Sequence, residues 1–278
     1  MANYTVKDIQ ALRERTGAGM MDVKKALDEA DGDVQKAMEI IRVKGLQGAA
    51  KREDRAAAEG LITATVKDGV GVMIEINSET DFVAKSDKFV ELGNTVLEVA
   101  VASGAQNLDD LLAVDYNGNP LGEYVKEEGA LLGEKVEVRR LARLDGAYVD
   151  SYLHRTSADL PAQVGVLFAV DADTETAQTA AHDVAVHIAA MSPTYLSRDE
   201  VPEDTVANER RIAEETARAE GKPERAMQNI IEGRLTGYFK EVALLDQPFA
   251  KDTKTTVGAV LEEAGTKAVS FARFRVGA

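Results

Sequence analysis

"LITATVKDGVGVMIEIN", residues 61–77, is the stretch that decides the fold. Apolar residues recur at every second position on both sides of Asp68-Gly69, which is the period of β-strands with one buried face. Asp-Gly between two such runs is the strongest short signal for a tight hairpin. The stretch therefore predicts a two-stranded β-hairpin and excludes an all-helical protein.

The same pattern occurs a second time further along the chain. "GAYVDSYLH" (146–154) and "QVGVLFAVD" (163–171) form another strand pair, and "VGVLFAVD" resembles "VGVMIEIN". Each pair precedes a helical pattern, one capped by Ser86 and the other running through "TETAQTAAHDVAVHIAAM" (174–191). Further strands are expected in "EKVEVRRLARL" and "AVSFARFRV", with a last helix near residues 256–264. We predict an α+β fold with a duplicated hairpin-plus-helix core.

A small helical module precedes the first hairpin. Residues 5–44 contain three helical patterns separated by "TGAG" and "DEADGD". Thr5 with Asp8 is expected to cap the first helix, and Asp31 the third. Such a bundle resembles ubiquitin-associated modules, which usually bind another protein. The Ala-rich, charged residues 44–60 are expected to form a helical or flexible linker.

An insertion interrupts the second repeat. Residues 201–245 hold two helical patterns around Gly221-Lys222-Pro223, which predicts an antiparallel helical hairpin of coiled-coil type. Its outer surface is highly charged, so it is either a solvated lever or a self-association arm. The residues expected to face each other across the hairpin are Ile212, Ala226, Ile230 and Leu235.

These patterns divide the chain into four units. Residues 1–55 form the helical module with its linker, and residues 56–145 form the first core subdomain. The second core subdomain comprises residues 146–200 and 246–278, and residues 201–245 form the inserted hairpin.

The composition limits the classes of partner. The 278 residues carry a net charge of −15, which argues against nucleic acid because phosphate binding needs a basic face. The chain has no cysteine, which excludes disulfides and thiolate metal sites and fits a reducing cytoplasm. Its first residues contain no apolar stretch, so we expect no signal or membrane segment and a cytoplasmic location.

No arrangement typical of a catalytic site is found in the sequence. "TGAGMMDVKK" lacks the spacing of a phosphate-binding loop and lies between helices. His182 and His187 are five residues apart on one helix, so they do not form a pair of metal ligands. A basic cluster on one strand is expected to be a solvated strand face, with contact to an acidic partner as the alternative: Arg139, Arg140 and Arg143. We expect no metal, no cofactor and no enzymatic chemistry.

One aromatic residue raises a question that the local sequence leaves open. "EINSETDFVAK" (75–85) leaves Phe82 among polar residues between a strand and a helix. The ring is either folded back under the sheet as part of the core or presented to a partner.

Several segments together resemble one protein family. "LRERTGAGMMDVKKAL" (12–27) and "EINSETDFVAK" are similar to the two signature motifs of bacterial elongation factor Ts. The shorter segments "SYLH", "EGR", "QPF" and "FARFRVG" fit the same family in the same order. The resemblance extends over nearly the whole chain.

The resemblance implies a nucleotide-exchange factor that binds the GTPase elongation factor Tu and releases its GDP. In the family, the second motif enters the GTPase beside its Mg²⁺ and phosphate site, and the corresponding residues here are Thr80, Asp81, Phe82 and Val83. It also implies that a helical hairpin of this kind serves dimerisation. Further contacts with the GTPase are implied for Arg13, Met20, Met21 and His154.

Three further expectations accompany this resemblance. Family members often carry a short helical segment after the last strand, and any contact made by that segment is expected to be absent here. An acidic hydrolase with an unrecognised site is one rival hypothesis. A scaffold whose helical module holds ubiquitin-like or chaperone partners is the other, but it gives no reason for the loop sequence Thr80-Asp81-Phe82-Val83.

Overall fold

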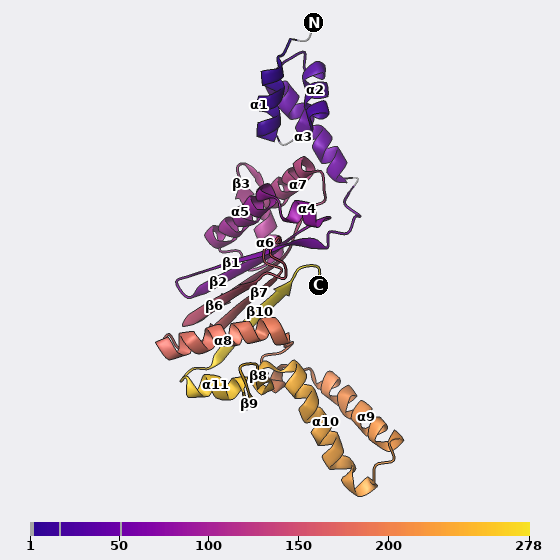
Figure 1. Ribbon diagram of the computed structural model, residues 1–278, viewed down its shortest axis with the longest axis vertical. Helices are drawn as coiled ribbons and strands as arrows, with labels where there is room; N and C mark the ends of the chain where they lie inside the picture. The colour runs from indigo at the N-terminus through magenta and orange to yellow at the C-terminus, as the bar shows by residue number, and fades with distance from the viewer. Residues whose placement is uncertain (1–2, 17, 51) are drawn as a thin grey trace.

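The computed structural model describes residues 3–16, 18–50 and 52–278, without the side chains of residues 46–50, and shows a mixed α+β protein, as predicted (Figure 1). At one end lie three helices, α1 (Val6–Thr16), α2 (Met20–Glu29) and α3 (Val34–Ala50). Their apolar faces meet around Leu12, Val23 and Leu27, which are all buried. The helical pattern at residues 5–44 thus predicted a real cluster of helices.

The ends of these helices partly differ from the sequence prediction. Thr5 and Asp8 cap α1 as expected, since the Thr5 N–H donates to the Asp8 carboxylate at 2.6 Å. The predicted cap of α3 is wrong. Asp31 lies in a turn with φ of 51°, and the Asp33 carboxylate instead accepts from the N–H groups of Gln35 and Lys36.

Two more boundaries can be compared with the sequence prediction. Helix α3 continues to Ala50, so the first part of the predicted linker is helical. The turn predicted at residues 16–19 includes residue 17, which lies outside the described residues.

The first sheet contains the predicted hairpin. Strand β1 (Glu59–Lys67) pairs with β2 (Val70–Ser78), and β5 (Glu137–Asp145) pairs with the other edge of β2, both antiparallel. The turn residues Asp68 and Gly69 have φ of 52° and 76°, as a type I′ turn requires. The hairpin prediction is confirmed.

Helix α5 (Asp87–Ser103) covers the outer face of this sheet and buries Phe89, Leu92 and Val96 against it. The stretch between α5 and β5 contains four elements. They are α6 (Leu108–Ala113), β3 (Asp115–Tyr116), β4 (Asn119–Pro120) and α7 (Leu121–Leu132).

The second sheet has the same connectivity as the first. Strands β6 (Tyr148–His154) and β7 (Val164–Val170) form a hairpin, helix α8 (Glu175–Met191) packs on it, and β10 (Ala268–Arg275) pairs with β7. In each sheet the second strand of the hairpin is central and the last strand is antiparallel to it.

The two sheets pack face to face, which places α5 and α8 on opposite outer sides (Figure 1). Met73 and Val149 lie in this interface with Leu167, all fully buried or nearly so. Gly71 and Gly165 permit the close approach. A Cβ atom on Gly71 would lie 2.7 Å from Val149 Cγ1, and one on Gly165 would lie 2.7 Å from Met73 Sδ.

Between α8 and β10 the chain leaves the core and returns. A 3₁₀ turn, η1 (Arg198–Glu200), leads into α9 (Glu203–Ala219), η2 (Glu224–Ala226) and α10 (Met227–Val242), and α9 with α10 forms a projecting hairpin (Figure 1). The chain returns through η3 (Leu244–Asp246), β8 (Pro248–Phe249), β9 (Asp252–Thr256) and α11 (Val257–Glu263).

Three of the four residues predicted for the hairpin seam are wrong by one position, and the fourth, Leu235, is buried in it as predicted. Ile212 is 41% exposed and Ile230 is only half-buried, whereas Ala213 and Ile231 are buried. One residue corresponds to about 100° around an α-helix, so a shift of one turns the apolar side chain out of the seam. The buried residues that form the seam are Ala213, Ala217, Met227, Ile231 and Leu235.

Candidate partner-binding site

The turn formed by residues 80–83 lies at the end of β2, between the first sheet and α5. The sequence predicted a polar connector, but residues 81–84 form a short helix, α4 (Asp81–Ala84). Thr80 is its N-cap, and the Thr80 hydroxyl accepts from the Val83 N–H at 3.4 Å. Ser, Thr and Asp are good helix starters, so the same polar residues that suggested a loop account for the helix.

Phe82 points away from the core. Its side chain is 74% exposed, while Phe89, seven residues later, is fully buried. The alternative that Phe82 is a core plug is therefore wrong, and Phe89 fills that place. Within the turn, Ala84 is buried and Val83 packs against the core cluster, so both anchor α4 from below.

A cation lies over the exposed ring. The Lys85 ammonium is 4.5 Å from the centre of the Phe82 ring and 3.3 Å from the Asp81 carboxylate. Both charged groups are substantially exposed, so this ion pair contributes little to stability. The surface of the turn thus presents an aromatic ring flanked by a carboxylate and an ammonium.

Two glutamates hold the base of the turn. One oxygen of Glu134 accepts from the N–H groups of Glu79 and Thr80, both at 3.0 Å, and the other accepts from the Thr80 hydroxyl at 2.6 Å. In return, the Glu79 carboxylate accepts from the Lys135 N–H at 2.7 Å. This N–H, together with Arg55, lowers the pKa of Glu79 below its ordinary value. We call this arrangement the carboxylate clamp, formed by Glu79 and Glu134.

The clamp was missed in the sequence. Glu134 is 54 residues from Thr80 in the chain, and an acidic residue after a helix is too common to suggest such a contact. Its only local signal is the preceding Gly133, which ends α7 with φ of 83° and turns the backbone toward the sheet.

The residues expected to make further contacts lie on two other elements. Met20 and Met21 open α2 and are 55% and 64% exposed, so neither belongs to the module core. Arg13 lies exposed on α1. His154 ends β6, where its Nδ1 lies 3.2 Å from the Tyr152 hydroxyl.

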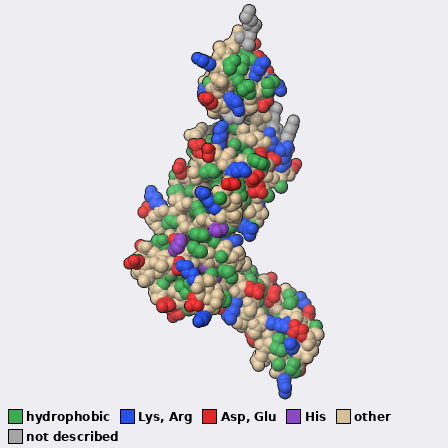
Figure 2. Space-filling view, in the orientation of Figure 1, with side chains coloured by type: hydrophobic (Ala, Val, Ile, Leu, Met, Phe, Trp, Pro, Cys, Tyr) green, Lys and Arg blue, Asp and Glu red, His purple; other side chains and the backbone are tan. Residues whose placement is uncertain are grey.

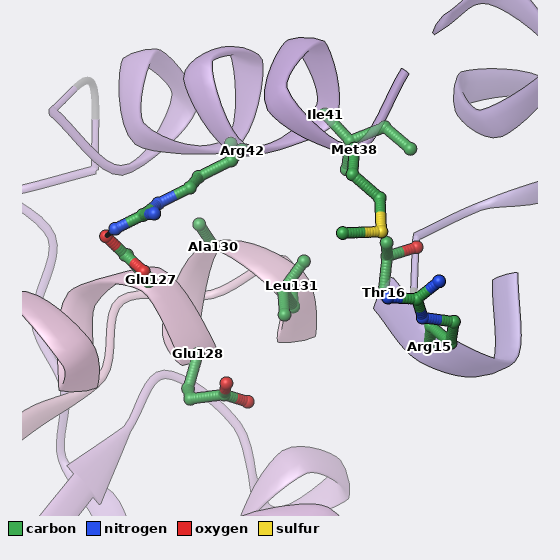
Figure 3. Close-up of a pocket in the computed structure, with 10 residues that line it drawn as sticks. Arg15, Thr16, Met38, Ile41, Arg42, Glu127, Glu128, Ala130 and Leu131 are labelled. Carbon is green, nitrogen blue, oxygen red and sulfur yellow. Dashed lines mark hydrogen bonds and ion pairs between the residues drawn. The ribbon is translucent and has the colours of Figure 1, made fainter. Parts of the chain in front are cut away.

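A contact between α3 and α7 joins the helical module to the core (Figure 3). Arg42 of α3 and Glu127 of α7 point toward each other and form an ion pair, and Leu131 of α7 packs against the module cluster. These residues border an open cavity of about 230 Å³ that also includes Met38 and Glu128. Burial raises the pKa of Glu128.

The histidines do not come together as one site. Figure 2 shows histidine side chains on the middle of the molecule. His182 pairs with Asp150 at 3.2 Å, and burial raises the pKa of that carboxyl. His187 is buried beside Gln247, so the two histidines of α8 face different surroundings, as the helical spacing predicted.

The expected solvated basic strand face is wrong for Arg140. The Arg140 guanidinium bonds the fully buried carboxylate of Glu75 on the neighbouring strand, with Nε–Oε2 of 2.6 Å, and lies 4.5 Å from the centre of the Phe274 ring. Arg139 is exposed and Arg143 is half-buried. Cross-strand register, which the sequence does not show, brings Arg140 opposite Glu75.

The described residues hold neither a cluster of metal ligands nor a helix that could span a membrane. Within residues 3–16, 18–50 and 52–278, no group of three or more acidic, histidine or cysteine side chains is placed to hold a metal ion. In the same part of the chain, no helix combines the length and the apolar character needed to cross a bilayer.

Comparison with known proteins decides the family. A family model described as elongation factor TS matches residues 79–278, beginning at the carboxylate clamp. Elongation factor Ts of Micrococcus luteus is 73% identical over 277 residues and covers all of both chains. The chain belongs to the elongation factor Ts family. Elongation factor Ts proteins of Pseudarthrobacter chlorophenolicus and Renibacterium salmoninarum are each 69% identical, again over the full length of both chains.

Membership in the elongation factor Ts family gives the process in which the chain acts. It is a translation elongation factor and acts in protein biosynthesis. The match to the Micrococcus luteus protein also extends over the residues of the three-helix module, which precede the part matched by the family model. The resemblance stated from "LRERTGAGMMDVKKAL" and "EINSETDFVAK" is confirmed.

Proposed function

We propose that this chain binds the GDP form of elongation factor Tu and promotes release of GDP, after which GTP binds. The observation that carries the proposal is the exposed Phe82 on a short helix whose base is tied to the core. A large apolar side chain that stays exposed on a well-bonded turn is suited to entering a partner. Exchange requires no bond to be made or broken, so the chain is not an enzyme.

The residues of the turn have distinct roles in this proposal. Phe82 is the wedge that separates packed elements of the GTPase. Asp81 helps to rearrange the groups that hold its Mg²⁺, while Thr80 and Val83 fix the turn and flank the ring. Loss of the ion removes the charge that neutralises the diphosphate, so GDP leaves. Because both bind elongation factor Tu, this chain and GDP each lower the other's affinity for the GTPase to the same extent.

We also propose roles for the other units. Residues 1–55 form a ubiquitin-associated-like docking module that offers Arg13, Met20 and Met21 to the GTPase. Residues 56–145, and residues 146–200 with 246–278, are two copies of a duplicated unit. Their common strand connectivity supports this division. His154 of the second copy makes a further contact with the GTPase.

The hairpin of residues 201–245 is proposed to serve self-association into a homodimer. Its two helices bury only a narrow seam between them, and its outer surface carries charges of both signs (Figure 2). No role for nucleic acid or membrane is proposed, and the chain is proposed to act in the cytoplasm. Replacing the hairpin by a short loop should lower the solution mass if it joins two copies.

Release of fluorescent GDP from elongation factor Tu tests the proposed function directly. Adding the protein in the presence of excess unlabelled GDP should accelerate the loss of signal in proportion to its concentration at low occupancy. A release rate that stays at its spontaneous value at every concentration would contradict the proposal. Excess Mg²⁺ should oppose the acceleration, because the proposed mechanism acts against the bound ion.

A further inference from the structure

The helix that carries Phe82 cannot orient itself. Helix α4 has four residues, and so short a helix is not stable on its own. Phe82 itself contributes little to holding it, because most of its ring is exposed. The direction of the ring is therefore set by the anchored residues Val83 and Ala84 together with the groups that hold the start of α4.

Thr80 is the place where the helix is held. Its hydroxyl accepts from the Val83 N–H inside the turn and donates to the Glu134 carboxylate at 2.6 Å. A second Glu134 oxygen accepts from two successive backbone N–H groups, those of Glu79 and Thr80. Three hydrogen bonds to one carboxylate fix both the backbone and the N-cap side chain, and bonds to a charged acceptor are the stronger kind.

We infer that Glu134 is a positioning residue for nucleotide exchange, because its carboxylate fixes the direction in which Phe82 leaves the surface. The inference rests on the proposed function. Glu134 does not touch the partner in this scheme. It removes the entropy cost of ordering the turn from the step in which Phe82 enters the docked GTPase, which is the advantage of a preorganised contact.

The second sheet offers a matched control for this inference. Asp171 directly follows β7, as Glu79 directly follows β2, and its carboxylate accepts from the Lys267 N–H at 2.7 Å and the Thr266 hydroxyl at 3.0 Å. This contact ties the end of the central strand β7 to Lys267, the residue before β10. It lies on the other sheet and holds no exposed aromatic turn.

The first experiment compares Glu134→Ala, Glu134→Gln and Asp171→Ala in the GDP release assay. Glu134→Ala should lower the maximal release rate by about tenfold. Its half-saturating concentration should change far less, because the module still docks. Glu134→Gln should lie between, since an amide keeps one acceptor oxygen. Asp171→Ala should release GDP at the parent rate. A parent-like rate for Glu134→Ala, or equal losses in both alanine variants, would overturn the inference.

The second experiment needs no GTPase. The chain contains no tryptophan, so Phe82→Trp introduces a single tryptophan on α4, whose fluorescence can be excited selectively. Adding Glu134→Ala to this variant should lower the tryptophan anisotropy, and adding Asp171→Ala should not. Unchanged anisotropy after Glu134→Ala would contradict the inference. If Glu134→Ala fails to fold, Glu134→Gln carries both measurements.

The two experiments separate the inference from the function on which it rests. A parent protein that leaves GDP release at its spontaneous rate would end the proposed function, while the anisotropy would still test the clamp. A parent that accelerates release beside an equally active Glu134→Ala would end the inference alone.

Discussion

The two sheets of the core are built alike and differ at one junction. In both, a hairpin leads into a helix of 17 residues, α5 or α8, and the last strand pairs with the central one. Both helices are capped by a hydroxyl, from Ser86 or Thr174, that accepts from the N–H three residues later. Both end in the left-handed region, at Gly104 and Ser192.

The junction between the central strand and the helix is where they differ. In the second sheet, residues 171–174 connect β7 to α8 directly, whereas in the first sheet the extra turn α4 lies between β2 and α5. Only the extra turn carries an exposed phenylalanine. The second sheet has the same connectivity without this turn, so the hairpin-plus-helix arrangement does not require it. Function can then be changed there at little cost to the fold.

The largest effects are expected from shortening two phenylalanines in the first half of the core, the exposed Phe82 and the buried Phe89. Phe82→Ala should reduce accelerated GDP release by about 30-fold, the effect of losing a hot-spot contact of about 2 kcal/mol. It should change the free energy of unfolding by less than about 0.5 kcal/mol, because the ring is exposed. Urea unfolding and the release assay measure the two effects.

Phe89→Ala is the buried counterpart of that variant. It should cost about 3–5 kcal/mol of stability by leaving a cavity between α5 and the sheet. A Phe82→Ala protein that is as unstable as Phe89→Ala, with parent-like release, would show that the extra turn is structural.

The next test concerns a fully buried charge on the central strand of the first sheet, which the central strand of the second sheet lacks. Glu75 is fully buried and accepts from Arg140, Asn77 and the Gly277 N–H, whereas the matching position in "VGVLFAVD" is Ala169. Glu75→Ala should cost about 3 kcal/mol, because its removal leaves donors without an acceptor. Changing Glu75 and Arg140 together to apolar residues should restore part of this loss. Additive losses in the double variant would contradict the pairing.

A smaller effect is expected at His187, which packs in the second half of the core and should make the folding stability depend on pH. Nδ1 of His187 accepts from the Ala250 N–H at 3.1 Å, so its Nε2–H donates to Gln247 at 2.8 Å and the ring is neutral. Burial lowers the pKa of His187 in the folded state. Below the unfolded value of about 6.5, the unfolded chain binds more protons, so stability is lost as the pH falls toward the lowered pKa.

Urea unfolding at pH 7.5 and pH 5.5 measures this loss. In His187→Gln the difference between the two pH values should shrink, because the titrating group is gone. Val99 of α5 holds the same position, counted from the start of its helix, as His187 of α8. Valine cannot titrate, so this position in the first sheet should contribute no such loss of stability in acid. An unchanged pH difference in His187→Gln would assign it to other groups.

The smallest expected effect lies at the two helix ends. Ser192 ends α8 with φ of 53°, where α5 has Gly104 with φ of 70°. Ser192→Gly should stabilise the protein by about 0.5–1 kcal/mol, since glycine adopts this conformation without a Cβ clash. Gly104→Ser should have the opposite sign. Melting temperatures of both variants test the comparison, and equal signs would contradict it.

Much of the fold was predictable because its signals are local. Alternation over residues 61–77 with Asp68-Gly69 predicted the hairpin, and Ser86 predicted the start of α5. These signals depend on neighbours two to four residues apart, which the sequence shows directly. The hairpin seam failed for the opposite reason. Both Ile212 and Ala213 are apolar, and only packing of α9 against α10 selects the alanine.

For the candidate site too, local features could be predicted from the sequence and long-range contacts could not. By itself, the sequence determined the family, through two long motifs, and singled out Phe82 as an aromatic residue among polar ones. Only the tertiary structure decided that the ring of Phe82 is exposed. It also decided that Glu134 holds Thr80, because a hydrogen bond across 54 residues depends on how α7 packs beside the sheet, and no local spacing encodes that.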